Sequence, residues 1–330
     1  MTTRWNGLSI PARRVLALCA LAAVPLVGLV VQPATASAVP VATHSGWVTR
    51  GPATTAPSVA HAARPRATGT GYDMVGSDGG VFVFGSNGGF FGSLPGLGIH
   101  VSNIVGMVGS SNGRGYFLVG SDGGVFSFGD TSYEGSLPGI GVHVDNIVGL
   151  VPSSDDKGYF LVGTDGGVFA FGDASFEGSL PGSGVNVTDI VGIAGTPDNR
   201  GYWLLGGDGT IYSFGTALPA QGLTCPAGNV CPPLVSIVST QSGQGLWITD
   251  AGGAVYNDGD AVNYGDFSNS SSGPTDIVSL VPSAGNLGYF LVGADGGIFA
   301  FGVTNFYGSL PALGISVDDI VGAVATNSVA

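Results

Sequence analysis

Charged residues are scarce in this chain, and basic residues are the scarcest of them. Of 330 residues, 9 are Lys or Arg and 22 are Asp or Glu, giving a formal net charge of −13. So few charges argue against a charge-laced helical bundle or coiled coil. Clustered Lys and Arg drive the binding of phosphate backbones, so this acidic balance also argues against nucleic acid as a partner.

Long hydrophobic runs are absent after the N-terminus, although the chain is 44% hydrophobic and contains 60 glycines. No later run is long enough to cross a bilayer. We therefore expect the hydrophobic residues to lie in short strands, separated by glycine-rich turns.

The N-terminus has the pattern of an export signal. Basic residues Arg4, Arg13 and Arg14 precede an apolar run at residues 15–31, and residues 36–38 read Ala-Ser-Ala. This is the order of a signal peptide, so residues 1–38 are expected to be removed, and the protein to be secreted, extracellular or associated with the cell wall. A retained membrane anchor is the alternative. Cleavage would remove three basic residues and no acidic one, leaving a formal charge of −16.

Residues 39–70 are rich in Ala, Thr, Pro and Val without a strand or helix period, which is typical of an extended linker. Of the 3 cysteines, only Cys225 and Cys231 would remain after cleavage. In an oxidising compartment they are expected to form one disulfide. No further Cys or His lies near them to complete a metal site.

Residues 71–330 consist of six copies of one unit, which recurs every 43 or 44 residues. Each copy starts with a Gly and an apolar strand, at Gly71, Gly115, Gly158, Gly201, Gly245 and Gly288. This period, with about four short strands per copy, predicts a six-bladed β-propeller. The weakest strand, at residues 173–180 in the third copy, is expected at the outer edge of its blade.

Two motifs within the unit have structural explanations. The Asp-Gly pairs, such as Asp122-Gly123, are typical of turns that need a positive φ. Aromatic residues two positions apart, such as Phe126 and Phe128, share one face of a strand and are expected to pack against the neighbouring blade.

The chain also indicates how the ring closes. A strand that usually reads Ile-Val-Gly precedes every unit except the first, and Ile320-Val321-Gly322 has no hairpin after it. We therefore expect the C-terminal strand to join the blade that begins at Gly71, which would leave no open sheet edge.

Residues 115–130 read Gly-Tyr-Phe-Leu-Val-Gly-Ser-Asp-Gly-Gly-Val-Phe-Ser-Phe-Gly-Asp. This segment resembles the Gly-Tyr-Trp-Leu-Val/Asp-Gly-Gly-Val-Phe repeat of secreted actinobacterial proteins, and the resemblance extends over residues 71–330. The layout is also similar to propellers of the regulator of chromosome condensation and β-lactamase inhibitor type. The resemblance implies an extracellular propeller, in some cases an accessory to hydrolase domains, and it supplies no catalytic residue.

Few residues suggest catalysis or metal binding. No Gly-x-Ser-x-Gly motif is present, and the recurring Gly-Ser-Leu-Pro is expected to be a loop. His100 and His143 occupy matching positions in adjacent copies and could share a site, while Glu134 and Glu177 are expected on diverging edge strands. No cofactor is predicted; the acidic loops leave calcium as an alternative, without an Asp-x-Asp-x-Asp-Gly ligand run.

The basic residues of the ring share one position. Arg114, Lys157 and Arg200 each precede the Gly that starts a unit, so they are expected to form an arc on one face. The arc is a candidate docking site for an anionic polymer or an acidic partner. The opposite face would carry the Asp-Gly turns, the two histidine loops, Asp145 and Asp189, which form the alternative binding site.

The sequence therefore predicts a secreted, monomeric, non-catalytic binding or scaffold module for a cell-envelope polymer or an extracellular protein. Two alternatives remain open: a multivalent carbohydrate-binding protein, and a hydrolase or lyase that uses the acidic face.

Overall fold

The computed structural model describes residues 69–85, 89–223, 232–270 and 272–327, all within the unit Ala62–Ala330. The predicted signal peptide lies outside the described residues, as do Cys225, Cys231 and all but the last two residues of the predicted linker. The export signal and the disulfide stay predictions.

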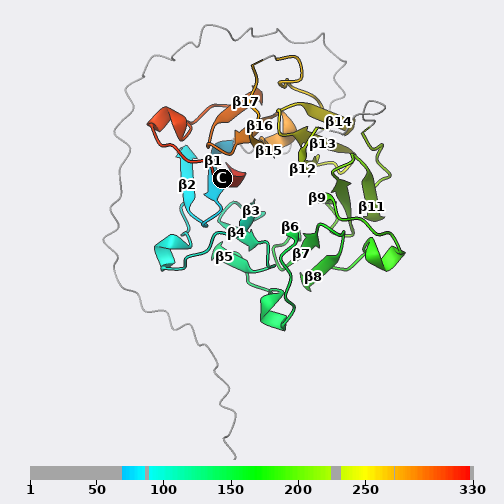
Figure 1. The fold of residues 1–330 in the computed structure, drawn as a ribbon. Coiled ribbons are helices and arrows are strands. Elements are labelled where there is room, and N and C mark those ends of the chain that lie inside the picture. Colours follow the sequence, from blue (N-terminus) through cyan, green and yellow to red (C-terminus); the bar gives the residue numbers. More distant parts are fainter. Residues whose placement is uncertain (1–68, 86–88, 224–231, 271, 328–330) are drawn as a thin grey trace, which may run out of the picture. The chain divides into compact units, whose positions relative to one another are not determined.

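Six antiparallel sheets of three strands are arranged in a ring (Figure 1), and we call them blades A to F, each given from its innermost to its outermost strand. Blade A contains β18 (Ile320–Asn327), β1 (Gly69–Gly76) and β2 (Val81–Gly85). Blade B contains β3 (Ile104–Gly109), β4 (Gly115–Gly120) and β5 (Val125–Gly129). Blade C contains β6 (Ile147–Pro152), β7 (Gly158–Gly163) and β8 (Val168–Gly172). Blade D contains β9 (Ile190–Gly195), β10 (Gly201–Gly206) and β11 (Ile211–Gly215). Blade E contains β12 (Leu234–Ser239), β13 (Gly245–Asp250) and β14 (Val255–Gly259). Blade F contains β15 (Ile277–Pro282), β16 (Gly288–Gly293) and β17 (Ile298–Gly302).

The six blades and their closure confirm the predicted fold. Strand β18 pairs antiparallel with β1, so the C-terminal strand completes the first blade of the chain. The pairing runs from Gly69 opposite Asn327 to Gly76 opposite Ile320. The first and last described strands thus lie in one sheet, so β1 has a partner strand on both edges.

The predicted fourth strand is wrong. Residues 173–180 form a loop and are followed by the short 3-10 helix η3 (Pro181–Ser183). The loop does not continue the sheet because Gly178 has a φ of +127° and the Leu180 N–H donates to the Gly166 carbonyl in the Asp-Gly turn, at 3.1 Å. Equivalent helices follow the outer strands of blades A, B and F: η1 (Pro95–Leu97), η2 (Pro138–Ile140) and η5 (Pro311–Leu313).

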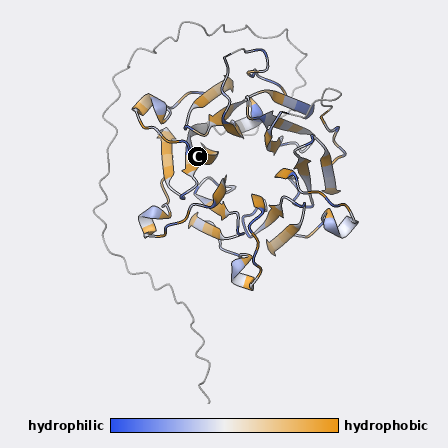
Figure 2. Ribbon diagram, in the orientation of Figure 1, coloured by the Kyte–Doolittle hydropathy of each residue, from blue (hydrophilic) through white to orange (hydrophobic). Residues whose placement is uncertain are grey.

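Five of the six middle strands contact the preceding blade through a Tyr hydroxyl, whereas β13 of blade E has Leu246 at this position. The hydroxyl of Tyr159 in blade C accepts a hydrogen bond from the Glu134 N–H at 3.2 Å and donates one to the Gly135 carbonyl, both in the loop from blade B. Phe171, which pairs with Tyr159 across the blade, packs its ring on Gly135. The paired aromatic residues are therefore core, as predicted, and the hydrophobic residues follow the strands (Figure 2).

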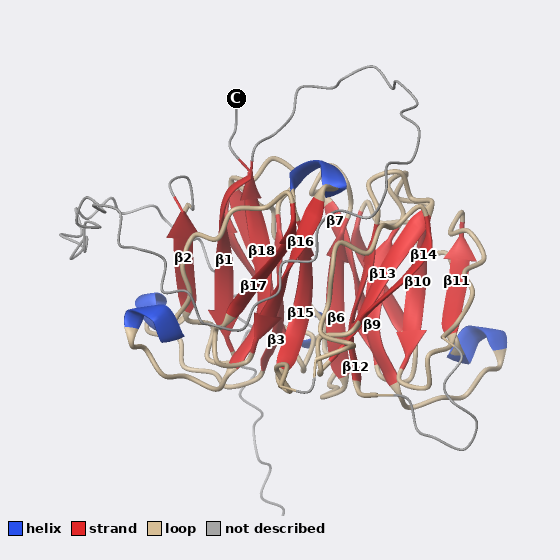
Figure 3. Ribbon diagram, turned by 90° about the horizontal axis from the view of Figure 1, so that it is seen from above, coloured by secondary structure: helices blue, strands red, loops and turns tan. Residues whose placement is uncertain are grey.

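The ring has two faces, seen at the top and bottom of Figure 3. We call one the Asp-Gly face, where the middle and outer strands of each blade are joined. The other is the basic-turn face, where the innermost and middle strands are joined; it includes η4 (Ala284–Asn286). At the Asp-Gly face, the innermost strand of one blade donates its first N–H to the turn of the previous blade, as Ile147 does to the Ser121 carbonyl at 3.0 Å. These bonds fix the positions of the innermost strands around the centre of the ring.

Candidate functional site

The predicted basic arc lies on the basic-turn face. Arg114, Lys157 and Arg200 end the turns between the innermost and middle strands of blades B, C and D, and all three side chains are exposed. The structure thus places them on three consecutive blades of one face.

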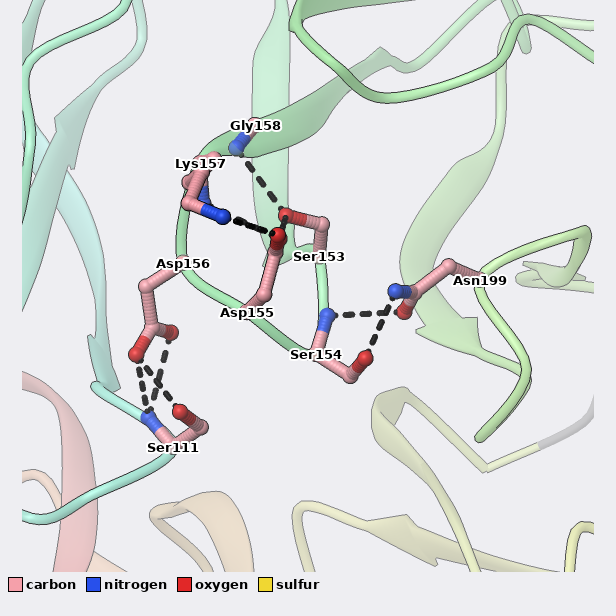
Figure 4. A network of polar contacts seen from close by, with 8 residues as sticks. All are labelled: Ser111, Ser153, Ser154, Asp155, Asp156, Lys157, Gly158 and Asn199. Carbon is pink, nitrogen blue, oxygen red and sulfur yellow. Dashed lines mark hydrogen bonds and ion pairs between the residues drawn. The ribbon is translucent and has the colours of Figure 1, made fainter.

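Hydrogen bonds link the three turns to one another (Figure 4). The Asp156 carboxylate of blade C accepts bonds from the Ser111 N–H of blade B at 2.9 and 3.1 Å and from its hydroxyl at 2.7 Å. Asn199 of blade D accepts from the Ser154 N–H at 2.8 Å and donates to the Ser154 hydroxyl at 2.7 Å. Both Asp156 and Asn199 have a positive φ, near 60°, which turns their side chains toward the preceding blade. Because the two residues share this backbone geometry and both bond to the preceding blade, their role is to join the blades.

Carboxylates lie among the bases of this arc. The Lys157 ammonium contacts the Asp155 carboxylate at 3.0 Å, and this hydrogen bond lowers the pKa of Asp155 to about 2 and raises the pKa of Lys157. Asp198, whose pKa is lowered chiefly by the Thr196 hydroxyl, accepts the Arg200 N–H at 3.1 Å. Lys157 is therefore paired with a carboxylate, and Arg200 has Asp198 on its own turn. The turn of Arg114 contains no carboxylate, but its Asn112 amide donates to the Asp130 carboxylate at 2.7 Å.

The Asp-Gly face has a different charge. Ten aspartates lie at its strand ends and turns, exposed or half-buried: Asp78, Asp122, Asp145, Asp165, Asp189, Asp208, Asp276, Asp295, Asp318 and Asp319. In the described part of the chain, the Lys and Arg residues all belong to the basic-turn face. The turn aspartates have a structural function as well: Asp165 Oδ1 accepts the Gly167 N–H at 2.9 Å, which confirms the predicted turn chemistry.

The inner rim of this face differs between blades. In blade B, the Asn103 amide and the Asp122 carboxylate both lie beside Gly120, so an amide group accompanies the carboxylate. In blade A, two carboxylates, Asp319 and Asp78, lie beside Gly76. Blade F repeats this carboxylate pair with Asp276 and Asp295 beside Gly293, and blade C repeats the amide pair. The rim therefore concentrates negative charge around the centre of the ring, and none of the described Lys and Arg residues lies on this face.

A cavity of about 550 Å³ opens at the centre of the same face. One valine from each innermost strand lines it: Val105, Val148, Val191, Val235, Val278 and Val321. All six are half-buried. Thr164, Thr188 and Asp189 add polar groups at its edge. The Ile-Val-Gly repeat thus builds an apolar channel mouth surrounded by carboxylates.

His100 and His143 lie exposed on the loops after η1 and η2, and Asp145 lies two residues after His143. Glu134 and Glu177 lie in the loops that replace the predicted edge strands. Within the described ranges, no three His, Cys, Asp or Glu side chains come together as metal ligands.

The sequence reasoning missed a second set of aromatic residues. Four lie two positions before the Gly of the Gly-Ser-Leu-Pro loops and are 54–60% exposed: Phe90, Tyr133, Phe176 and Phe306. The Tyr133 hydroxyl is 2.9 Å from the Ser136 hydroxyl of its own loop, which fixes the side chain beside η2. Their constant distance from the Gly was the signal that could have found them.

No family model matches the chain, and no curated protein matches it. A solved structure that resembles it is the β-propeller domain of Cps50 (Swd1) from Myceliophteria thermophila, at 15% sequence identity and a TM-score of 0.44. The match covers 64% of this chain and 68% of that one. In the part of the chain that the structure describes, no helix is long and apolar enough to span a membrane. The assignment as a six-bladed β-propeller rests on the strand pairing of this chain itself.

Proposed function

We propose that the protein is a secreted, non-catalytic binding or scaffold module that recognises a basic protein partner through its Asp-Gly face. The segregation of charge between the two faces carries this proposal. Each basic residue of the basic-turn face has a carboxylate on its turn or bonded to it, whereas the Asp-Gly face combines ten aspartates with an apolar channel mouth. Complementary charge favours a basic partner for such a surface and accelerates its association.

The proposal is tested by removing equal charge from each face. The first variant changes three inner-rim residues to Asn: Asp189, Asp276 and Asp319. The matched control changes three residues of the opposite face to Asn: Asp130, Asp155 and Asp173. Both variants alter net charge equally, so a difference between them reports the location of binding.

Binding of a fluorescent octalysine peptide is measured by anisotropy at low and moderate salt. We expect the first variant to bind at least fivefold more weakly and with a smaller salt dependence, and the control to bind as the parent does. Equal losses in the two variants, or no binding by the parent, would contradict the proposal.

The exposed aromatic residues favour a second candidate function, multivalent carbohydrate binding. Exposed rings at four repeated positions offer flat apolar faces at the edge of the ring. Changing Phe90, Tyr133, Phe176 and Phe306 to Ser should abolish binding on a glycan array if this candidate is correct. An array on which the parent binds no glycan would exclude it.

A further inference from the structure

The channel mouth has the shape and chemistry of a side-chain pocket. Its walls are the methyl groups of six equivalent valines, and its volume of about 550 Å³ lies within the range of small-ligand sites, about 300–1,000 Å³. Apolar walls stabilise an apolar group by removing its surface from water. The chemistry of the walls therefore selects an aliphatic or aromatic group.

The walls are held in place by close packing of the innermost strands. The residue after each valine is Gly or Ser, and a Cβ on Gly149 would lie 3.2 Å from Ile193 of the next blade. At the blade E and F boundary, the Ser236 hydroxyl accepts the Leu280 N–H at 3.4 Å. The pocket is thus formed before any ligand arrives, which lowers the cost of binding.

The rim determines which apolar group can approach. Asp189 lines the cavity, and the carboxylate pairs of blades A and F lie on the same rim without an amide beside them. Burial of Tyr212 raises its pKa, and the nearby Asp208 and Asp189 carboxylates raise it further, which reflects the negative potential here. A second copy of this chain would bring the same carboxylates against each other. A group flanked by positive charges is complementary instead.

We propose that the channel mouth receives one apolar side chain of the partner, flanked on both sides by Lys or Arg that contact the carboxylate rim. This inference rests on the proposed function and adds its specificity. The rim supplies attraction to any basic segment, and the valines discriminate between segments by the side chain at the centre.

The test compares four peptides that differ at one position, Gly-Lys-Lys-X-Lys-Lys-Gly, in which X is Ser, Ala, Val or Leu. We expect affinity for the parent protein to rise along this series, with Leu at least tenfold above Ser. This part needs no protein variant, so it does not depend on the folding of one. Equal affinity for all four peptides would overturn the inference while the proposed function stands; no binding of any would overturn both.

Two variants show whether the valines or the rim carboxylates cause the preference for the Leu peptide over the Ser peptide. Changing Val148 and Val278 to Thr keeps the shape of the walls but adds hydroxyls, and it should reduce the preference for Leu over Ser to less than threefold. The Asn variant of Asp189, Asp276 and Asp319 should weaken both peptides equally and preserve the ratio. A preference for Leu that survives the Thr changes in a folded protein would place the apolar contact elsewhere and overturn the inference.

Discussion

Blade A has the same three-stranded architecture as the other five blades, but its strands come from two separate segments of the chain. In blades B to F, one continuous segment supplies all three strands, and the third residue of the middle strand is a buried aromatic: Phe117, Phe160, Trp203, Trp247 or Phe290. In blade A, the two ends of the described chain supply the strands, and the same position holds Asp73, which is 2% exposed.

The cost of this difference is visible in the core between blades A and B. Among the described residues, four buried side-chain atoms have no hydrogen-bond partner, and two of them, Asp73 Oδ1 and the Thr326 hydroxyl, belong to blade A. The other two are the hydroxyls of Ser127 and Ser283. Blade A therefore has both the closing strand and the least favourable core contact, so its stability should govern that of the ring.

The largest effect should come from removing the closing strand. Deleting residues 316–330 removes β18 and the buried Ile320, so β1 loses its pairing partner on one edge and the neighbouring β3 and β15 each lose one packing partner. Each large side chain contributes about 1.5–3 kcal/mol when buried, and exposed strand edges favour aggregation. We expect no cooperative thermal transition of a monomer, measured by calorimetry and size-exclusion chromatography.

A matched pair of point variants compares the loss of a buried Ile in the closing strand with the same loss in the innermost strand of blade C. Ile320→Ala in blade A and Ile147→Ala in blade C change residues that are each 1% exposed at the same strand position. Each should cost about 2–5 kcal/mol in urea unfolding. A folded, monomeric deletion variant with an unchanged melting temperature would refute closure by β18.

The second prediction concerns the pH dependence of stability. Burial raises the pKa of Asp73 from its usual value of 3.8 to about 7, and the Asp73 carboxylate in turn raises the pKa of Tyr116 in blade B. Since the folded state holds the proton more tightly, its stability should be full below about pH 4 and fall as the pH rises to about 7. The fall should be on the order of 3 kcal/mol.

Two substitutions should remove this pH dependence. Asp73→Asn keeps the shape without the charge, and Asp73→Phe restores the aromatic residue of the other blades. Urea unfolding from pH 4 to pH 8 should show a flat profile between pH 4 and 7 for both, relative to the parent. Asp165→Asn, in an exposed turn of blade C, is the control that should retain the slope. A parent slope that persists in Asp73→Asn would contradict the assignment to Asp73.

The third prediction concerns the tyrosine bonds between blades. Burial raises the pKa of Tyr159 to about 12, so its hydroxyl is protonated and donates at neutral pH. Tyr159→Phe leaves the Gly135 carbonyl and Glu134 N–H without this partner, at a cost of about 1–3 kcal/mol. Tyr72→Phe, which removes the same bonds between blades F and A, should cost as much. If the two variants differ in unfolding free energy by more than this cost, the boundary between blades F and A is not packed like the boundary between blades B and C.

The smallest effect is expected from Lys157. Its ion pair with Asp155 is exposed to solvent and should contribute little, so Lys157→Gln should leave the melting temperature unchanged. Asp156→Gly, one residue earlier, keeps the positive φ but loses three hydrogen bonds to blade B, and it should lower the melting temperature measurably. The reverse order would contradict the structural role given to Asp156.

Much of the fold could be predicted because each copy repeats the same local chemistry. The Gly-Tyr start, the Asp-Gly turn and the unpaired Ile320 strand each have a local cause that the sequence displays. The edge strand at residues 173–180 was predicted wrongly because Gly178 is held by Phe214 and the Tyr202 hydroxyl of the next blade, which lie far away in sequence. Pro181 then begins η3.

The candidate site was less accessible to sequence reasoning. The equal spacing of Arg114, Lys157 and Arg200 showed that they share a face, but the contacts of Asp155 and Asp156 depend on turn geometry. The valine at each Ile-Val-Gly strand could be read only as an apolar residue, since its exposure to the channel requires six strands together. Asp73 was visible as an Asp in an aromatic position; its burial by blade B was not.

The pairing of Gly69 with Asn327 also determines how the molecule can be attached to anything else. The polypeptide enters and leaves the ring side by side on the basic-turn face, because β1 begins and β18 ends there. A tether, a fusion partner or a solid support joined directly before residue 69 or after residue 327 would therefore be connected on that side. Such an attachment would leave the Asp-Gly face on the opposite side of the ring, accessible to a partner.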